Sequence, residues 1–405
     1  MKADTKQNAG DTPSKYTWEY ELQWYYHNFN WYYFTFLFIV PTCALFLGKD
    51  VELRWNTLLM CAVFHYTAGS GISIGYHRLW THKSFQACTA LRYFLAIAGA
   101  AQAHRSILEW VTHHRAHHQY TDTDLDPYNA RRGFLFTHIG WLVARNPKSW
   151  GKVDVSDLMK DPVVVWQSRY YRLLTILFVL ILPTSVAHFG WDDWKGGLLY
   201  CTVYRTLITS HIVFLVNSLA HSSWAGTQPY SDKHTARNVS PFWALLSGGE
   251  TNHNFHHTFP TDFRTGLHWS EFDISQWAIR VFEKLGLAWD LTTVSQSEIE
   301  QAILRQKKRE LGIDLDGETK SVSSLPSMDW AYFIGQSDLG RRLICIDGVV
   351  HDVASFMSDH PGGPDQIQEF VGKDATDAFH SGQHPHSPHA ETLLAGMRVA
   401  IIQRP

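Results

Sequence analysis

Four stretches of this chain carry almost no charged residues and are long enough to cross a lipid bilayer. An α-helix needs about 20 apolar residues to span a hydrocarbon layer of roughly 30 Å. The uncharged runs cover residues 22–48 (with 31–47 as the apolar centre), 56–76, 173–191 and 198–220. The last is interrupted by Arg205, and a charged side chain is costly in lipid, so we expect Arg205 to face the helix bundle or a polar cavity. The sequence therefore predicts a mainly α-helical domain with four transmembrane helices.

The distribution of basic residues predicts how these helices are oriented. Short links at residues 49–55 and 192–197 join the helices into hairpins, so both termini are expected in one compartment. These links hold only Lys49, Arg54 and Lys195, whereas the long segment between the second and third runs is rich in Lys and Arg. Basic residues favour cytoplasmic loops. We therefore expect a cytosolic helical cap, with both termini on the cytosolic side.

Composition excludes several other classes of protein. The net charge of −3 gives no basic footprint for nucleic acid. The 5 cysteines show no paired spacing, so neither a disulfide framework nor a thiolate metal site is predicted. The chain instead contains 24 histidines, so the unusual chemistry is that of imidazole.

Histidines recur with the spacing of metal ligands. His114, His117 and His118 stand at positions i, i+3 and i+4, which places them on one face of a helix. The same spacing returns at His253, His256 and His257. His113 lies beside the first triplet but outside the repeated pattern.

Further candidates lie where the second and fourth apolar runs end. His77 and His82 are five residues apart, which would point their rings apart on a regular helix, so we expect the helix to end or bend there. His221 closes the fourth run, with Asn217 one turn earlier on the same face. Both runs end on the same side of the membrane, so all nine histidines can meet. Nine imidazoles predict a site for two metal ions, but imidazole suits zinc, copper, iron and nickel alike.

The remainder of the chain predicts a separate domain. We divide the chain into a polar lead-in (1–21), the membrane domain (22–290), a helical and flexible linker (291–327) and a small α+β domain (328–405). The linker begins with a charged helix, expected at 295–311, before a stretch rich in Ser and Gly. Short apolar runs, turn residues and one helical pattern make up the last domain.

The last domain resembles cytochrome b5. The resemblance rests on Asp359-His-Pro-Gly-Gly363, on Gly372-Lys-Asp-Ala-Thr-Asp-Ala-Phe379 and on His386-Ser387. It implies haem b held from both sides by His360 and His386, lined by Phe356 and Phe379, with His380, His384 and His389 as rivals for the second ligand. A haem with both axial positions filled transfers electrons. Its partner must be redox-active, which favours iron over zinc for the nine-histidine site.

Residues 20–290 resemble the acyl-CoA Δ9 desaturases, the stearoyl-CoA desaturase family, and the fused arrangement resembles its fungal members. The motifs are Gly75-Tyr-His-Arg-Leu-Trp-Thr-His82, His114-Arg-Ala-His-His118, Asp126-Pro-Tyr-Asn-Ala-Arg-Arg-Gly133, Asn217-Ser-Leu-Ala-His221 and His253-Asn-Phe-His-His-Thr-Phe-Pro260. The resemblance implies that the nine histidines hold two irons and that Asn217 reaches one iron through a water. It implies O2-dependent insertion of a cis double bond into palmitoyl- or stearoyl-CoA.

Other features of this enzyme are expectations from the same likeness. NADH-cytochrome b5 reductase would supply electrons to the haem, in the endoplasmic reticulum membrane. We expect Arg145 and Lys148, with Lys152, to meet the phosphates of CoA, although a basic loop near anionic lipid fits them equally well. Tyr76 is expected either to close the far end of the acyl tunnel or simply to pack at a helix end.

Two alternative functions remain open from the sequence. A membrane hydroxylase, or a desaturase acting at another position, would use the same iron site. From a different class, a membrane-anchored haem electron carrier would use the histidine clusters to bind structural zinc. The position of the double bond in the product, or a hydroxyl group in its place, would distinguish the first alternative from a Δ9 desaturase. Zinc in place of iron would identify the second alternative.

Overall fold

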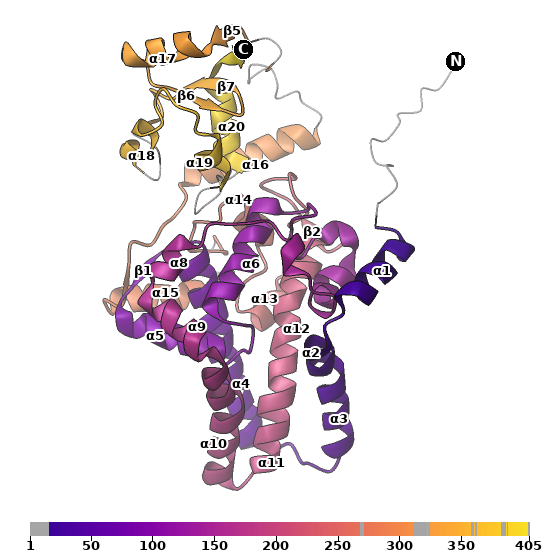
Figure 1. The fold of residues 1–405 in the computed structure, drawn as a ribbon. Coiled ribbons are helices and arrows are strands. Elements are labelled where there is room, and N and C mark those ends of the chain that lie inside the picture. Colours follow the sequence, from indigo (N-terminus) through magenta and orange to yellow (C-terminus); the bar gives the residue numbers. More distant parts are fainter. Residues whose placement is uncertain are drawn as a thin grey trace.

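The computed structural model describes residues 16–403, except residues 268–270, 312–321, 323–324, 358–359, 361–362, 382–385 and 387. Long helices extend from one side of a cap of shorter helices (Figure 1). A small domain of helices and strands lies on the opposite side of this cap (Figure 1). This arrangement confirms the predicted mainly helical fold with a separate α+β domain.

Among the described residues, three continuous helices are long and apolar enough to cross a membrane. They run over Trp55–Thr81, Pro162–Trp191 and Trp194–His221. Their segments are α4 (Trp55–Ser70) and η2 (Gly71–Thr81); α9 (Pro162–Thr175), η6 (Ile176–Ile181) and α10 (Leu182–Trp191); and α11 (Trp194–Gly196), η7 (Gly197–Tyr204), α12 (Arg205–Ser218) and η8 (Leu219–His221). The predicted second, third and fourth spans are therefore present, and the third begins well before residue 173.

The predicted first span is a shorter apolar helix, Trp31–Leu47. It consists of α2 (Trp31–Phe34), η1 (Thr35–Ile39) and α3 (Val40–Leu47). Large apolar side chains on this helix and on the long helices face outward, with Leu47 86% and Phe189 85% exposed. Such a surface suits lipid rather than water. The links from α3 to α4 and from α10 to α11 lie at the end remote from the cap, as the hairpin prediction requires (Figure 1).

Arg205 lies inside the helix bundle, as predicted, and is only 4% exposed. Its Nε donates to the carbonyl oxygen of Cys201 at 3.0 Å. One terminal nitrogen donates to the carbonyl oxygen of Ala101 at 3.2 Å and reaches Oε1 of Gln102 at 3.4 Å. A carbonyl oxygen of its own helix, one at the end of α5 and the Gln102 side chain therefore take the place of water around this charge.

The polar lead-in predicted at residues 1–21 is partly helical, which corrects that boundary. Helix α1 covers Trp18–Asn28, and the Thr17 side chain accepts a hydrogen bond from the Tyr20 backbone N–H. Glu21 also accepts two hydrogen bonds of 2.8 Å from the Arg132 guanidinium. A helix cap and a bidentate ion pair stabilise a helix start that composition alone did not indicate. Residues 1–15 lie outside the described part of the chain.

The cap contains the helices that follow the second span. The principal ones are α5 (Thr89–Ala100), α6 (Ile107–Tyr120), α14 (His253–Thr258) and α15 (Ile274–Lys284). Shorter elements complete the cap: β1 (Gln86–Ala87), η3 (Ala130–Arg132), η4 (Phe136–Gly140), α7 (Trp141–Val143), η5 (Pro147–Ser149), α8 (Ser156–Lys160), β2 (Gly226–Thr227), β3 (Asn238–Val239), α13 (Phe242–Ser247) and β4 (Ala288–Trp289). Strands β1 and β4, and β2 and β3, form antiparallel pairs.

Helix η2 packs closely on α5 because both carry glycine at the contact. A Cβ on Gly71 would lie 2.1 Å from the backbone nitrogen of Gly99. A Cβ on Gly99 would lie 2.2 Å from the Tyr76 ring. The two backbones can therefore approach only without side chains at these positions.

The predicted charged helix of the linker is α16 (Gln296–Glu310). It begins with a capping box in which Ser295 and Glu298 satisfy each other's backbone N–H groups. Residues 312–321 and 323–324 of the predicted linker are outside the described part of the chain.

The last domain is built on a four-stranded sheet of order β5-β8-β7-β6. Its elements are β5 (Ser327–Asp329), α17 (Trp330–Asp338), β6 (Leu343–Ile346), β7 (Val349–Asp352), α18 (Pro364–Gln368), α19 (Thr376–Ser381), α20 (Pro388–Gly396) and β8 (Arg398–Gln403). Alternate residues of β6 enter two cores, Leu343 beside Phe333 and Ile344 beside Phe379. The period of two follows from strand geometry, and the second core adjoins the two haem-ligand candidates.

Candidate functional site

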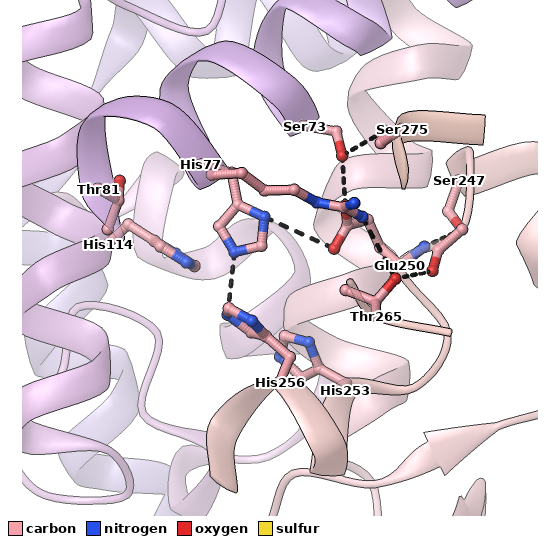
Figure 2. A network of polar contacts seen from close by, with 12 residues as sticks. Ser73, His77, Thr81, His114, Ser247, Glu250, His253, His256, Thr265 and Ser275 are labelled. Atoms are coloured by element: carbon pink, nitrogen blue, oxygen red, sulfur yellow. Dashed lines mark hydrogen bonds and ion pairs between the residues drawn. The ribbon is translucent and has the colours of Figure 1, made fainter. Parts of the chain in front are cut away.

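All nine histidines predicted as ligands meet where the long helices enter the cap. They come from η2 and its end, from α6, from η8 and from α14. Ring nitrogens lie within 4.8 Å of one another in each of two groups, which we call the five-histidine group (His77, His82, His114, His118 and His256) and the four-histidine group (His117, His221, His253 and His257). Figure 2 shows His77, His114, His253 and His256 converging from three elements.

Distances within the five-histidine group match those between ligands on one metal ion. The Nε2–Nε2 distance is 2.9 Å from His77 to His256 and 3.0 Å from His256 to His118. His118 and His114 are separated by 3.1 Å between the same atoms. Two imidazole nitrogens bound at about 2.1 Å to one ion, at a right angle, lie about 3 Å apart.

The four-histidine group has the same geometry. His253 Nε2 lies 3.0 Å from His257 Nε2 and 3.1 Å from His221 Nε2. His117 Nε2 is 3.3 Å from His257 Nε2. Each group can therefore surround one ion with ring nitrogens, and the residues present fit two metal ions.

A π-helix explains how His77 and His82 reach the same group. The His82 backbone N–H donates to the His77 carbonyl oxygen at 3.1 Å, an i to i+5 bond. This bond defines a π-helical turn, so both side chains leave the helix on one side, with ring centroids 4.9 Å apart. The helix does end at Thr81, as expected, but a π turn rather than a bend aligns the rings.

Oxygen acceptors fix the orientation of two ligands in the four-histidine group. His117 Nδ1 lies 3.0 Å from Oδ1 of Asp126, and His221 Nδ1 lies 2.8 Å from Oγ1 of Thr235. The Thr235 hydroxyl donates to Asp122 at 2.7 Å, so it accepts from His221. Both rings therefore carry their proton on Nδ1 and leave Nε2 free to bind a metal.

A buried polar network supports His77 in the other group (Figure 2). Glu250 Oε2 lies 3.6 Å from His77 Nδ1, and its other oxygen accepts from Ser73 and, at 3.1 Å, from Arg78. Asp273 also pairs with Arg78 at 3.1 Å. Burial favours the neutral acid, but Arg78 and His77 outweigh it and lower the pKa of Glu250 below its usual range. A carboxylate is therefore held beside this ligand.

The candidate metal ligands that lie in the cap, outside the membrane-spanning helices, are kept neutral by their surroundings. Burial and the neighbouring rings place the pKa of His114, His118, His256 and His257 well below the usual range. Burial likewise lowers the pKa of His253 to about 3. Neutral imidazole is the form that binds a metal.

A pocket of about 1250 Å³ opens beside both groups. Metal-site residues in its wall include His77, His114 and His253, and Asn217 lies in the same wall. The remaining wall is largely apolar, with Tyr33, Phe36, Ile72, Trp110, Trp141, Ile212, Val213 and Phe214. An apolar wall of this kind suits a hydrocarbon chain.

The structure places the predicted substrate contacts at different distances from this pocket. Arg145 reaches His113 Nε2 at 3.3 Å, and His113 lines the pocket. Burial and nearby Arg105 lower the pKa of Arg145 to about 10. Arg105 itself lines the pocket, and its guanidinium stacks over Tyr33 at 4.9 Å. Lys148 is exposed on η5 and is not among the described lining residues.

Tyr76 lies on η2 but points away from the described wall of this pocket. Its ring is buried against α5, and its hydroxyl accepts from Nε2 of Gln167 at 2.7 Å. Ser73 and His77, on either side of it in η2, do line the pocket, whereas Tyr76 is not among the described lining residues. The side chain therefore packs in the core beside α5.

His360 and His386 face each other in the last domain. Their ring centroids are 6.1 Å apart. Two metal–nitrogen bonds of about 2 Å on opposite sides of one iron, with the ring radii added, give a similar separation. His360 Nδ1 bonds to the Gly363 carbonyl oxygen at 3.2 Å, and His386 Nδ1 to the Phe379 carbonyl oxygen at 2.9 Å, so each Nε2 is available. The pair fits axial ligation of haem.

The neighbours of this pair agree with a haem pocket. Phe379 stacks on His386 at 4.1 Å, and Phe356 lies 6.0 Å from His360. Among the rivals for the second ligand, His380 is exposed and bonds to Asp347 at 2.7 Å. His384 and the side chain of His389 lie outside the described part of the chain.

Sequence reasoning did not identify the groups that support the ligands. Glu250 lies far in sequence from His77, and Asp122 supports His221 only through Thr235. Asp126 stands within a quoted motif, nine residues after His117, and that proximity was the available signal. The sequence indicated Arg105 only as one of many basic residues between the second and third apolar runs.

Family models match both parts of the chain. The model described as "Fatty acid desaturase" matches residues 52–290, and "Cytochrome b5-like Heme/Steroid binding domain" matches residues 333–403. The first range contains all nine histidines, and the second contains His360 and His386.

Several known desaturases are similar to this chain over much of its length. "Probable acyl-CoA desaturase" of Schizosaccharomyces pombe is 39% identical over 392 residues, covering 94% of this chain and 79% of its own length. "Acyl-CoA desaturase 1" of Saccharomyces cerevisiae is 37% identical, covering 94% of this chain and 75% of its own length. "Stearoyl-CoA desaturase 5" of Homo sapiens is 41% identical over 60% of this chain and 74% of its own length. The chain therefore belongs to the fatty acid desaturase family and carries a cytochrome b5-like domain in its C-terminal part.

Proposed function

We propose that this protein is an O2-dependent acyl-CoA Δ9 desaturase that introduces a cis double bond into palmitoyl- or stearoyl-CoA. The observation that carries the proposal is the position of two histidine groups in and beside the wall of one largely apolar pocket. The names of the matched relatives support acyl-CoA as substrate.

The proposed ions are two non-haem irons, one in each histidine group. Nitrogen spacing supports two ions, and the neighbouring haem domain supports a redox metal. When bound, these irons supply the oxidant that an unactivated methylene requires. Oxygen takes two hydrogens from the acyl chain, and two electrons and two protons complete its reduction to two waters.

Residues of this chain hold and orient the reactants. Asn217, in the pocket wall beside His253, would reach one iron through a water. Arg145 and Lys148 would meet the phosphates of CoA outside the apolar pocket, and the adjacent Arg105 strengthens the positive potential there. The neutral, buried histidines leave their Nε2 atoms available for the irons.

Electrons would arrive through haem b held by His360 and His386. NADH-cytochrome b5 reductase is proposed as the upstream donor. The apolar helices support a membrane location, and we assign the protein to the endoplasmic reticulum, with both termini and the active site in the cytosol.

The test is expression in a host that lacks Δ9 desaturation, followed by gas chromatography of fatty acids with double-bond mapping. We expect new Δ9 monoenes, and none with His117→Ala. A hydroxylated product or a different double-bond position would replace this proposal with the corresponding enzyme. Activity of His360→Ala is expected only when separate cytochrome b5 is supplied.

Metal analysis of active protein tests the cofactor assignment. We expect two non-haem irons for each haem-bearing chain. Zinc at full occupancy in active material would contradict the redox assignment of the nine-histidine site.

A further inference from the structure

We infer that the haem domain docks on the segment of residues 230–235, so that electrons reach the metal centre from the side of the four-histidine group. The inference rests on the proposed function, because it identifies the surface used for electron delivery. The structure connects this segment to metal-ligand elements on one side and to the haem domain on the other. We call it the docking segment.

The inner side of the docking segment is bonded to α14. The backbone N–H of Tyr230 donates to Oδ1 of Asn254 at 2.9 Å, and Nδ2 of Asn254 donates to the Ser231 carbonyl oxygen at 2.7 Å. Asn254 is buried and directly follows His253. The segment therefore cannot move without disturbing the helix that supplies three of the nine histidines.

The end of the docking segment reaches a second ligand. The Thr235 hydroxyl accepts from His221 and donates to Asp122, as described above. The Asp122 backbone N–H in turn donates to Asp126 at 3.0 Å, and Asp126 holds His117. Both routes inward thus lead to ligands of the four-histidine group.

The outer side of the docking segment contacts the haem domain. Lys233 forms an ion pair with Glu391 of α20, and the two side chains are 39% and 40% exposed. Helix α20 begins two residues after His386. One carboxylate of the helix that follows His386 therefore contacts the docking segment.

A second ion pair ties the linker helix to the same segment. Arg309, near the end of α16, pairs with Asp232. The linker helix and the haem domain thus converge on neighbouring residues. In each transfer one ferrous haem would lose one electron and one ferric non-haem iron would gain it, with no bond made or broken.

Charge reversal in the full-length holoprotein tests the docking surface. The measured rate is that of haem re-oxidation after acyl-CoA and oxygen are added to protein with reduced haem. We expect Lys233→Glu and Glu391→Lys each to slow it about two- to fivefold, since an exposed ion pair contributes up to about 1 kcal/mol. The double charge swap is expected to restore the rate, and Lys233→Arg to retain it.

A second readout does not depend on turnover. Carbodiimide joins a lysine amine directly to a carboxylate in contact with it, so peptide mass spectrometry should detect a Lys233–Glu391 link in the wild type. Lys233→Arg should lose this link while keeping the rate. Lys284→Glu and Asp338→Lys, reversals at exposed positions on α15 and α17, should change neither readout.

Either of two kinetic results would overturn the docking surface: single reversals that leave the rate unchanged, or a double swap that is no faster than the slower single variant. Absence of the cross-link in the wild type would also overturn it. A separate experiment tests the chemistry without electron transfer from the haem domain. All metals are reduced chemically, acyl-CoA and oxygen are added, and the product is measured. If the wild type forms no product in that experiment, the proposed function is contradicted. The cross-link would still test the docking surface independently.

Discussion

The Asp126 carboxylate accepts the Nδ1 proton of His117 at 3.0 Å, with both side chains almost completely buried. The contact fixes the ring so that Nε2 points to the four-histidine group. Loss of such an orienting group typically reduces metal affinity about 10- to 100-fold.

We therefore expect Asp126→Asn to lower the iron content of purified protein and to weaken iron rebinding after chelation by about 10-fold or more. The measurement is iron per chain at a series of free iron concentrations. Asp50→Asn, an exposed change between α3 and α4, is the control and should bind iron as the wild type does. Equal iron affinity in both variants would show that Asp126 does not orient His117.

Glu250→Gln preserves the shape of the side chain but removes its charge. Arg78 is 2% exposed and would keep Asp273 as its only charged partner among the described residues. Breaking a buried pair completely costs about 3–5 kcal/mol, so we expect a loss of about 1–3 kcal/mol here. The thermal midpoint in detergent should fall, together with iron retention. The half-exposed Glu109→Gln is the control and should leave the midpoint nearly unchanged.

Gly71→Ala is expected to separate η2 from α5, because the added Cβ would meet the Gly99 backbone, which cannot rotate away. Gly69→Ala is a matched control two residues earlier, where nothing lies within 4 Å of the added atom. Alanine there favours the helix by about 1 kcal/mol. Thermal unfolding should therefore show a lower midpoint for Gly71→Ala and an equal or higher one for Gly69→Ala. Similar midpoints for both would contradict the packing.

Acid is expected to destabilise the haem domain through His351. Burial lowers the pKa of His351 from 6.5 to about 4, so the unfolded domain binds a proton that the folded domain excludes. Stability is therefore lost as pH falls from about 6.5 to about 4, by up to about 3 kcal/mol.

The check is thermal unfolding of the full chain at pH 7 and pH 5, followed by haem absorbance. His351→Gln, whose amide can still donate to the Leu394 carbonyl oxygen, should lose less stability between the two values. His380→Gln changes an exposed histidine and is the control. An unchanged pH dependence in His351→Gln would rule out this group.

Local sequence spacing located the ligands but not the groups that support them. Helical periodicity brings His114 and His118, or His253 and His257, onto one face, so their proximity follows from neighbouring residues alone. The contact of Glu250 with His77 joins residues far apart in the chain. Such pairings depend on how the cap packs, and one sequence does not encode that packing in any short pattern.

Backbone geometry limited the prediction at η2. A regular helix would separate His77 from His82, so we expected the helix to end or bend between them. The π turn brings the two rings together instead, because it changes the angle at which each side chain leaves the axis. Apolar runs likewise located the long helices, but not the continuation of α9 over residues 162–172, where charged residues occur within the same helix.

The continuous chain from α16 to the haem domain has a kinetic consequence. A donor on the same polypeptide meets its acceptor at an effective concentration set by the connecting segment rather than by the amount of free carrier. Electron delivery then becomes first order in protein, and dilution of the membranes should leave the turnover of each molecule unchanged while its haem remains reduced.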